Sequence, residues 1–350
     1  MLGPLKERAF AVMHHTGLSA RVASSGWRRR RLLILGYHGI ARWDEDLWNP
    51  GLYFSASRFA RRLELLRRHR CNVLPLGEAI DRLGRNDLPD RAVVLTFDDG
   101  YHDFATIAYP LLRAHGYPAT VYLTTLRCEH NFPIVRLLLS YLLWSKREAQ
   151  LDGSGLPGLV PKRYPLADAK TREAVVDALT AAARESHFDR FDNDEVARQV
   201  AGRLGLAYDR YSAMHLLTLL SPEDVAQLAN EGVDFQMHSH RHWSPEDPAL
   251  LARDLRNNRE RIERLTGRAA EHFCYPSGVY FTRQLATLSQ LGIRTATTCD
   301  PGLANADIDP LLLPRFVDTN LVTENTFSSW LNGTAALMSR HTAGARSRNP

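Results

Sequence analysis

The sequence predicts an α/β fold whose parallel sheet closes, or nearly closes, into a barrel. Two observations support this prediction. Short apolar runs that are typical of buried strands alternate with helical patterns, and the alternation continues along most of the 350 residues. Such alternation indicates βαβ units, in which helices link parallel strands. The number of units favours a barrel, although periodicity alone does not separate a barrel from an open sheet.

The first part of the alternation covers residues 31–124. Its strand-like runs are short, apolar and rich in β-branched side chains. Strands are expected at Arg31–Tyr37, Cys71–Leu74, Ala92–Phe97 and Ala119–Thr124. Between them, apolar residues recur at helical spacing. Helices are therefore expected at Phe59–His69, Leu76–Leu83 and Phe104–His115.

The pattern then changes and later resumes. From about residue 127 to 221 it is mostly helical, with a loop-like stretch at Asp152–Pro165, which we interpret as an inserted helical cap or a substrate-shaping lid. Further strands are expected at Val233–Met237, His272–Tyr275, Arg294–Thr298 and Leu311–Leu313. Further helices are expected at Pro222–Asn230, Pro248–Leu265, Thr282–Leu291 and Glu324–Met338. The barrel with its insertion is thus expected over residues 31–341, and the tail 342–350 is expected to be disordered.

Residues 1–30 are predicted to form a basic N-terminal arm. Lys6, Arg8, Arg21 and the run Arg28–Arg31 stand against the single acid Glu7. The simpler interpretation is a solvated arm. The functional alternative is peripheral contact of residues 1–31 with an anionic membrane face or a phosphate-bearing lipid carrier. Nucleic acid is not expected as a partner, because no recognition motif accompanies the charge.

Cysteine usage and targeting signals favour a cytoplasmic protein. The four cysteines show neither paired metal-ligand spacing nor a dense disulfide framework. No signal peptide and no run of about 18 apolar residues is evident. We therefore expect a cytoplasmic location, with peripheral association at the inner membrane face as an extension of it.

Two adjacent carboxylates end the expected strand Ala92–Phe97. Asp98 and Asp99 follow it directly and are followed by Gly100. Two neighbouring ionised carboxylates repel each other, so a cation or an arginine is expected nearby. On its own, this pair is better explained by one aspartate that caps the next helix.

Three histidines in five residues follow the expected strand Val233–Met237. His238 and His242 are four residues apart, and on one helical turn their imidazoles would point at one ion. His240 would lie on the other side of such a turn, which makes it either a residue that supports the metal ligands from behind or a pocket residue. With one aspartate, two histidines leave positions open for water, as a catalytic metal site requires. A divalent metal is expected, with zinc as the ion that fits best; zinc lowers the pKa of water from about 15.7 towards about 7.

The motifs in their order resemble those of the NodB-like polysaccharide deacetylases, carbohydrate esterase family four. The resemblance rests on TFDDG at 96–100, HSxxH at 238–242, FCYPSG at 273–278 and LPR at 313–315. It runs from about Leu32 to about Phe316. It implies a distorted (β/α) barrel with an incomplete strand count, a divalent metal, and hydrolysis of an N-acetyl group on an amino sugar.

The resemblance also implies roles for individual residues. Asp99, His238 and His242 match the metal ligands, and Asp98 matches the general base that activates the attacking water. A four-residue loop matches a wall of the substrate groove, where a backbone N–H stabilises the oxyanion. That loop consists of Tyr275, Pro276, Ser277 and Gly278.

The sequence departs from the family pattern at two positions. Cys274 stands where the family usually has an arginine that steadies the base, and Arg315 is our candidate substitute. The late Leu-x-x-His motif has no counterpart after Arg315. Leu35 to His38 resembles that motif moved to the N-terminus, as in a circularly permuted branch of the family. His38 is therefore the candidate acid for the leaving amine, with a strand-end histidine bonded to backbone as the alternative.

The predicted function is metal-dependent removal of N-acetyl groups from amino sugars of a polysaccharide or its lipid-linked precursor. A deformylase or small-molecule amidase of the same fold is an alternative. A non-catalytic glycan-binding protein is another, which only the cysteine at position 274 supports. A membrane-surface scaffold built on residues 1–31 is the third.

Overall fold

The computed structural model describes residues 4–129, 133–185 and 190–338, which form two compact units. Unit 1 holds the described residues up to Glu129 and from Leu220 onward, and unit 2 holds those between them. The tail at 342–350, expected to be disordered, lies outside the described residues.

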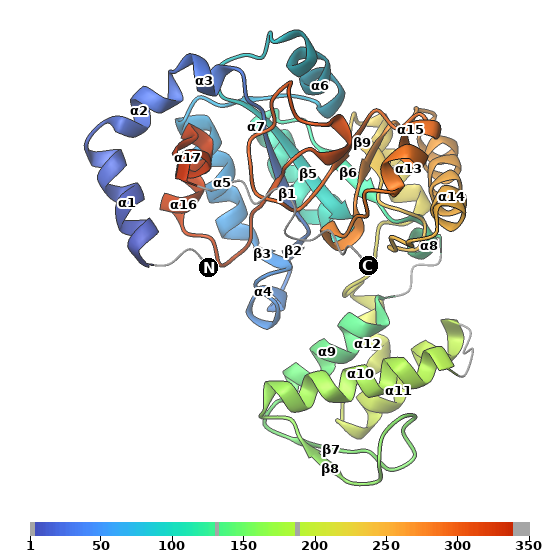
Figure 1. The fold of residues 1–350 in the computed structure, drawn as a ribbon. Helices are drawn as coiled ribbons and strands as arrows, with labels where there is room; N and C mark the ends of the chain where they lie inside the picture. The colour runs from blue at the N-terminus through green and yellow to red at the C-terminus, as the bar shows by residue number, and fades with distance from the viewer. Residues whose placement is uncertain (1–3, 130–132, 186–189, 339–350) are drawn as a thin grey trace. The chain divides into compact units, whose positions relative to one another are not determined.

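Unit 1 is built on a parallel sheet of eight strands (Figure 1). The strand order is β11-β10-β9-β6-β5-β1-β12, and β4 pairs with the start of β5. The strands are β1 Leu33–Tyr37, β4 Asn72–Val73, β5 Ala92–Asp99, β6 Thr120–Leu123, β9 Asp234–Met237, β10 His272–Cys274, β11 Thr295–Thr297 and β12 Phe316–Val317. The sheet curls into a barrel of the predicted (β/α) type.

One short segment, which includes β12, connects β11 with β1. Leu313 forms a parallel bridge with Thr297, and three residues later Phe316 pairs with Leu35 of β1. Residues 313–317 therefore form the seam between β11 and β1. The strand expected at Leu311–Leu313 is wrong, because Pro310–Leu312 forms the 3-10 turn η3, in which the Asp309 carboxylate accepts the N–H of Leu311.

The strands of the sheet in unit 1 are mostly buried on both faces, as a parallel sheet covered by helices requires, and the short strand β4 at its edge is partly exposed. All eight residues of β5 are buried. Val93, Leu95 and Phe97 belong to the larger apolar cluster, shared with the surrounding helices, and Val94 belongs to a second cluster that includes Cys274. By strand alternation, Asp98 lies on the face of Val94, the same face as Cys274.

Helices surround the sheet at most of the expected places. They are α5 Ala56–Arg68, α6 Leu76–Arg85, η1 Phe104–Ala108, α7 Tyr109–His115, α8 Thr125–Cys128, α13 Pro222–Asn230, α14 Pro248–Thr266, α15 Gln284–Gln290, α16 Glu324–Asn332 and α17 Thr334–Met338. A smaller layer follows β1: β2 Gly39–Ala41 pairs with β3 Tyr53–Ser55, and α4 Glu45–Trp48 lies between them in sequence. The turn η2 Pro276–Gly278 follows β10.

The N-terminal residues are helical and pack on the body of unit 1. They form α1 Pro4–His15, α2 Leu18–Ala23 and α3 Gly26–Arg29, and Phe10 is buried. Arg28 is fully buried, and its guanidinium donates to the carbonyls of Leu331, Arg31 and Ala92. The expectation of a solvated basic arm is wrong for this residue, because its charge supports the fold.

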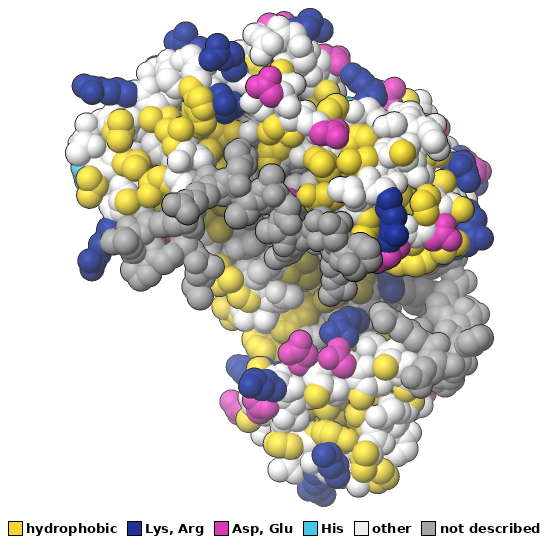
Figure 2. Space-filling model, viewed as in Figure 1, with side chains coloured by type: hydrophobic (Ala, Val, Ile, Leu, Met, Phe, Trp, Pro, Cys, Tyr) yellow, Lys and Arg dark blue, Asp and Glu magenta, His cyan; other side chains and the backbone are white. Residues whose placement is uncertain are grey.

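The surface gives no sign of a concentrated basic region on the face that Figure 2 presents. Among the described side chains drawn there, Lys and Arg are scattered between acidic and apolar ones. Within the described residues, no helix has both the length and the apolar character needed to cross a membrane.

Unit 2 is a small helical body with its own core. Its elements are α9 Val135–Ser145, α10 Ala169–Glu185, α11 Arg190–Arg203, α12 Tyr208–Ala213 and the antiparallel pair β7 Gln150–Asp152 and β8 Arg163–Pro165. Leu142, Leu179 and Val200 are fully buried. The stretch expected as a loop is thus partly a hairpin, whose short strands carry too few apolar residues to be predicted.

Candidate active site

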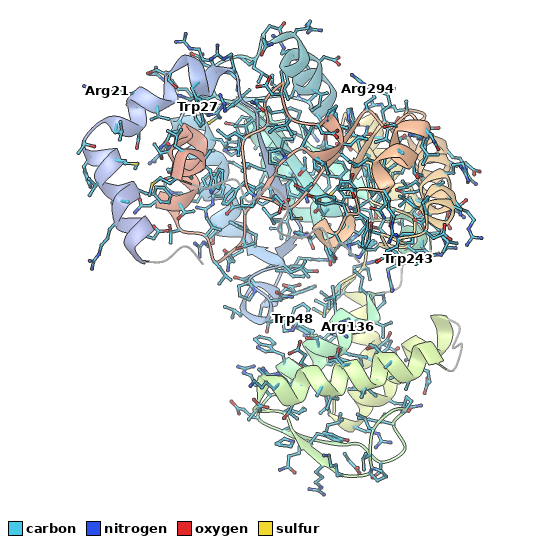
Figure 3. All side chains as sticks on the ribbon, in the orientation of Figure 1. Arg21, Trp27, Trp48, Arg136, Trp243 and Arg294 are labelled. Atoms are coloured by element: carbon cyan, nitrogen blue, oxygen red, sulfur yellow. The ribbon has the colours of Figure 1, made fainter. Side chains whose placement is uncertain are left out.

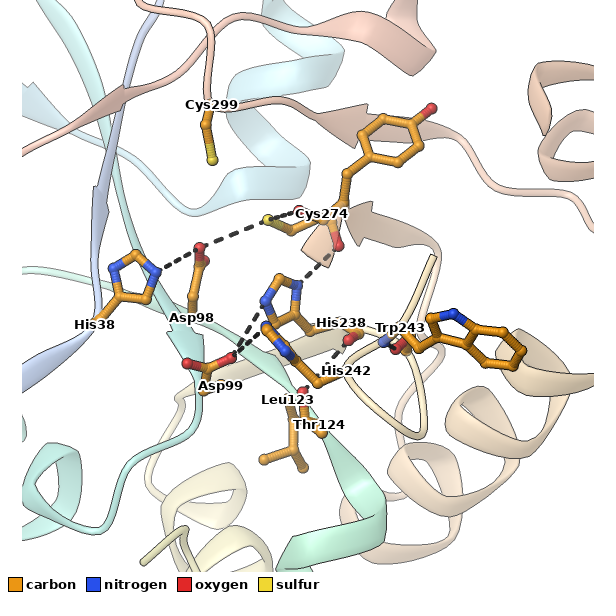
Figure 4. A network of polar contacts seen from close by, with 12 residues as sticks. His38, Asp98, Asp99, Leu123, Thr124, His238, His242, Trp243, Cys274 and Cys299 are labelled. Carbon is orange, nitrogen blue, oxygen red and sulfur yellow. Dashed lines mark hydrogen bonds and ion pairs between the residues drawn. The ribbon is translucent and has the colours of Figure 1, made fainter. Parts of the chain in front are cut away.

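The expected site residues meet at the carboxyl ends of the strands (Figure 4). β5 supplies Asp98 and Asp99, the residue after β1 is His38, and the loop after β9 supplies His238 and His242. In parallel sheets, the carboxyl ends of the strands form the edge at which ligands bind. Segments far apart in the sequence thus form one cluster.

Asp98 and Arg315 form a buried bidentate ion pair. Arg315 Nη1 lies 2.5 Å from Asp98 Oδ1, and Nη2 lies 2.6 Å from Oδ2. Arg315 is fully buried and Asp98 is 2% exposed. Burial raises the pKa of Asp98, but Arg315 outweighs burial and lowers that pKa to about 2. The expected substitute for the missing family arginine is therefore placed against the candidate base.

Asp99 points at the histidines because the strand ends there. Regular alternation would send adjacent side chains to opposite faces. Asp99 has a φ of 67°, in the left-handed region, which turns its carboxylate out of the pleat. Burial raises the pKa of Asp99, but His242 and His238 outweigh burial, and the net shift is downward. The two aspartates therefore stay ionised side by side.

His238 and His242 converge on one oxygen of Asp99. Their Nε2 atoms lie 3.4 Å and 3.2 Å from Asp99 Oδ1. The expectation of a helical turn is wrong: residues 238–242 form no helix, and left-handed conformations at Ser239 (φ 64°) and His242 (φ 53°) bring the imidazoles together.

Helix α14 holds this histidine loop. Asn258 accepts the backbone N–H of His238 at 3.1 Å. One turn earlier, Asp254 accepts the N–H of His240 at 2.7 Å and pairs with Arg241. Both α14 side chains are buried, so the loop is fixed by the fold.

The cluster has the donor set of a divalent metal site. Asp99 Oδ1 is buried and has no hydrogen-bond partner within the described part of the chain. His238 Nδ1 lies 2.8 Å from the carbonyl oxygen of Cys274, which as acceptor selects the Nδ1–H tautomer and leaves the Nε2 lone pair facing Asp99. One carboxylate and two imidazoles, with donor atoms within 4.8 Å of one another, suit zinc.

His38 lies on the other side of Asp98. Its Nε2 is 3.6 Å from Asp98 Oδ2, and its side chain is 22% exposed. A partly exposed imidazole beside the base can exchange a proton with a substrate. The structure thus brings His38 to the site from the first strand of the sheet, which is adjacent to the last.

Cys274 and Cys299 flank the ion pair. Cys274 Sγ lies 3.7 Å from Asp98 Oδ2, and Cys299 Sγ lies 3.7 Å from Arg315 Nη2. Both thiols are free. Cys274 thus leaves room beside the base for an arginine that comes from the seam of the barrel.

Most backbone N–H groups of the loop expected to form a wall of the substrate groove already make hydrogen bonds within the protein. Tyr275 is buried; its hydroxyl donates to the carbonyl of Leu311, and its N–H to Thr297. The N–H of Gly278 donates to Tyr275, and Pro276 has no N–H. Of the four residues in this loop, only the exposed Ser277 has a backbone N–H that remains a candidate for binding an oxyanion.

His240 is not available as a substrate-binding residue in this structure. Its side chain is 3% exposed, and its Nδ1 lies 2.9 Å from the hydroxyl of Thr125. Of the two expectations for His240, the pocket position is wrong because the non-helical loop directs its ring into the protein, and the supporting position behind the ligands fits its contact with Thr125.

Two residues near the site were not predicted. Asp103 is buried and accepts the backbone N–H of Ile40. Trp243 directly follows His242, is 46% exposed, and projects from unit 1 (Figure 3). Its position after a metal-ligand candidate was a usable signal for Trp243. No sequence signal pointed to Asp103, because a single sequence does not show which backbone N–H its carboxylate accepts.

The family comparison matches the chain to one family. The sequence model described as polysaccharide deacetylase matches residues 85–151 and 157–296, more than half of the chain. The poly-beta-1,6-N-acetyl-D-glucosamine N-deacetylase of Escherichia coli K12 is 56% identical over 99 residues. That match covers 28% of this chain and 14% of the relative's length.

Solved structures share the fold at low sequence identity. The Streptococcus pyogenes deacetylase PplD in complex with acetate aligns with a TM-score of 0.56 at 18% identity, over 85% of this chain and 96% of that one. IcaB from Ammonifex degensii aligns with a TM-score of 0.54 at 16% identity, over 86% and 97%. These alignments confirm the barrel fold.

Proposed function

The chain belongs to the polysaccharide deacetylase family, a family of carbohydrate N-deacetylases, and from that premise we propose that its site hydrolyses N-acetyl groups of amino sugars with the help of a divalent metal. The observation that carries the proposal is the Asp98–Arg315 ion pair beside the Asp99–His238–His242 cluster.

In this proposal, Asp99, His238 and His242 hold the cation. A bound divalent cation such as zinc would polarise the acetamide carbonyl and make water more acidic. The ligands suit that task because the fold positions each one: the backbone turn at Asp99, the Cys274 carbonyl at His238, and the bent loop at His242.

Asp98 accepts the proton of the attacking water. A pKa of about 2 keeps the carboxylate ionised at neutral pH, so it is always ready to accept. The low value also weakens its basicity. Arg315 thus lowers the proton affinity of Asp98 but fixes its charge and its orientation. A bidentate pair holds both carboxylate oxygens in the plane of the guanidinium.

His38 donates the proton to the leaving amine. Water adds to the carbonyl carbon, the carbon–nitrogen bond breaks, and acetate and a free amino sugar leave. His38 and Asp98 have opposite roles in the reaction. Asp98 takes a proton from water, and His38 gives a proton to the leaving nitrogen. The distance of 3.6 Å between His38 Nε2 and Asp98 Oδ2 supports this proposal, because both groups could reach one bound amide.

The substrate we propose is an N-acetylglucosamine polymer or a lipid-linked precursor of it. The relative from Escherichia coli is named for poly-beta-1,6-N-acetyl-D-glucosamine. Trp243 is adjacent to His242 in sequence and its exposed indole points away from Asp99 (Figure 4), so we propose that its flat apolar face contacts a sugar ring outside the acetyl-binding position. A cytoplasmic location, with contact to the membrane face, stays a prediction from the sequence.

Acetate release from N-acetylglucosamine oligomers tests the proposal. Metal-stripped, zinc-reconstituted and Asp98→Asn proteins are compared on soluble β-1,6-linked and β-1,4-linked oligomers. We expect release only from the zinc-reconstituted wild type. Formate release from N-formyl sugars without acetate release would instead support the deformylase alternative. Zinc binding at one equivalent with no hydrolysis of any acyl sugar would support the glycan-binding alternative.

A further inference from the structure

Asp103 is a buried acid that the proposed chemistry does not use. It follows Asp99 by four residues and is 7% exposed. Its Oδ1 accepts the backbone N–H of Ile40 at 2.7 Å. Burial raises the pKa of Asp103 well above its ordinary value, against the opposing effect of the Ile40 hydrogen bond.

A buried carboxyl group such as that of Asp103 lowers the stability of the fold. Burying a carboxyl group costs free energy unless hydrogen bonds or charges compensate. Glu45, which is also buried, raises the pKa of Asp103 further, while Arg42 acts in the opposite direction. A leucine would fill this space at lower cost. The hydrogen bond to Ile40 is the specific interaction that the carboxyl group adds.

Ile40 lies two residues after the candidate acid His38. The chain between them is held on its other side as well: the N–H of Gly39 donates to Leu52 at 3.2 Å. The ring of Tyr53 packs on Gly39 so closely that a Cβ there would lie 2.2 Å from a ring carbon. The His38 backbone is thus clamped between β3 and Asp103.

The segment that carries Asp103 also carries the base. β5 ends at Asp99, the chain turns at Gly100, and Asp103 precedes the π-helical turn η1. Asp98 and Asp103 are therefore fixed by one short, continuous stretch. Its contact with Ile40 ties the loop of the acid to the strand of the base.

We propose that Asp103 is a positioning residue that fixes His38 against Asp98 through the backbone of Ile40. The proposal rests on the proposed function, in which His38 is the acid. It gives the segment 98–103 three tasks: base at Asp98, metal ligand at Asp99, and placement of the acid at Asp103.

A double-mutant cycle tests the proposal in zinc-reconstituted protein on N-acetylglucosamine oligomers. Asp103→Ala removes the acceptor, and we expect kcat to fall about 10- to 100-fold with KM little changed, since misplacement of a reacting group acts on the chemical step. Asp103→Asn keeps an acceptor oxygen and should recover most of the loss. In a His38→Ala background, Asp103→Ala should have no further effect. Equal losses in both backgrounds would overturn the proposal.

Two further measurements keep the test independent of turnover. In the NMR spectrum, the Ile40 amide proton should shift upfield in Asp103→Ala, and the His38 ring signals should move or broaden. Unchanged His38 signals would contradict the proposal even if the wild type were inactive. The zinc Kd, measured with the metal alone, should stay within about 3-fold of the wild-type value. Losses of about 10- to 100-fold in metal affinity arise when a hydrogen-bond partner of a metal ligand is removed, and Asp103 bonds to Ile40 instead.

Glu45→Ala is the matched control. Glu45 is also a buried carboxylate, and its Oε2 accepts the N–H groups of Arg42 and Trp43. Its removal should lower stability to a similar degree and leave the His38 ring signals in place. If Glu45→Ala moved those signals as much as Asp103→Ala, a general loosening of the loop would explain both and the proposal would fail. Wild-type inactivity, by contrast, would count against the proposed function.

Discussion

Arg315 and Asp98 are 217 residues apart in sequence and form a bidentate ion pair with no exposure of the guanidinium. Removing one partner of a buried pair strands the other charge. We therefore predict that Arg315→Ala lowers the free energy of unfolding by about 3–5 kcal/mol. Denaturant unfolding measures this. Arg61→Ala, which breaks the exposed pair with Glu324, should cost less than about 1 kcal/mol.

Arg315→Lys separates charge from geometry. Lysine keeps one positive charge and loses the planar fork that holds both oxygens of Asp98. We predict a fall in kcat of about 10²-fold, with zinc binding retained, because orientation of the base is lost. Acetate release and zinc titration check the two halves. A lysine variant with wild-type kcat would show that the charge alone suffices.

Gly36 makes room for Arg315. A Cβ at residue 36 would lie 3.1 Å from Cζ and Nε of that arginine. Gly36→Ala should therefore displace the guanidinium and reduce kcat while the fold persists. Gly84, in helix α6, is the matched control, since a Cβ there meets nothing within 4 Å. Gly84→Ala should keep wild-type kcat and raise stability by about 0.5–1 kcal/mol.

Loss of a metal-ligand candidate should be visible in binding. We predict that His242→Ala weakens zinc binding by about 10²-fold or more, because only two protein ligands remain. Isothermal titration with zinc measures the Kd. His240→Gln should stay near the wild-type Kd, as the His240 ring contacts Thr125. Equal losses in both variants would contradict the ligand assignment.

The start of helix α13 predicts an acid-dependent stability term. Asp224 accepts the N–H of Ser221 in a capping box, and its contact with His102, at 3.6 Å between Oδ2 and Nδ1, is the main cause that lowers the pKa of Asp224 from 3.8 to about 2. The folded state thus holds the proton less tightly than the unfolded state. This stability is present above pH 3.8 and is lost as the pH falls towards 2. Asp224→Asn should cost about 1 kcal/mol at pH 7 and flatten the acid limb of a stability–pH curve.

Trp243 offers a test of substrate size. Its backbone N–H donates to Ser239 Oγ. The buried side-chain amide of Gln284 donates to the carbonyl of Pro245, two residues later. The loop that carries the indole is thus held by hydrogen bonds to Ser239 and Gln284. Trp243→Ala should raise KM for N-acetylglucosamine oligomers roughly 10-fold, the order of one aromatic contact, and leave kcat nearly unchanged. An equal effect on a monosaccharide substrate would place the contact at the acetamide itself.

The sequence was most informative where one local pattern decided the structure. The β-branched, apolar run Ala92–Phe97 predicted a buried strand, and Asp98 and Asp99 end it as expected. The (β/α) barrel followed from alternation together with the family resemblance, and the alignments confirm it. Arg315 was found because a missing arginine at Cys274 demanded a cation near two carboxylates.

What could not be predicted depends on backbone conformation and on long-range contacts. The left-handed residues Ser239 and His242 replace a helical turn, and non-glycine residues give no signal for that conformation. Asp103 meets Ile40 across 63 residues. Arg28 stood in a basic run that composition alone marks as solvated, and only the packed structure shows three carbonyls around it.

The seam at residues 313–317 carries Arg315, and this has a consequence for assembly. The segment bridges β11 and β1, so the guanidinium reaches Asp98 only when the barrel is closed. Residues 313–317 follow every other strand of the sheet in sequence, so they leave the ribosome after those strands. Until the seam docks, the two carboxylates face each other without their counter-charge. The Arg315–Asp98 ion pair can therefore form only after every other strand of the sheet has been synthesised.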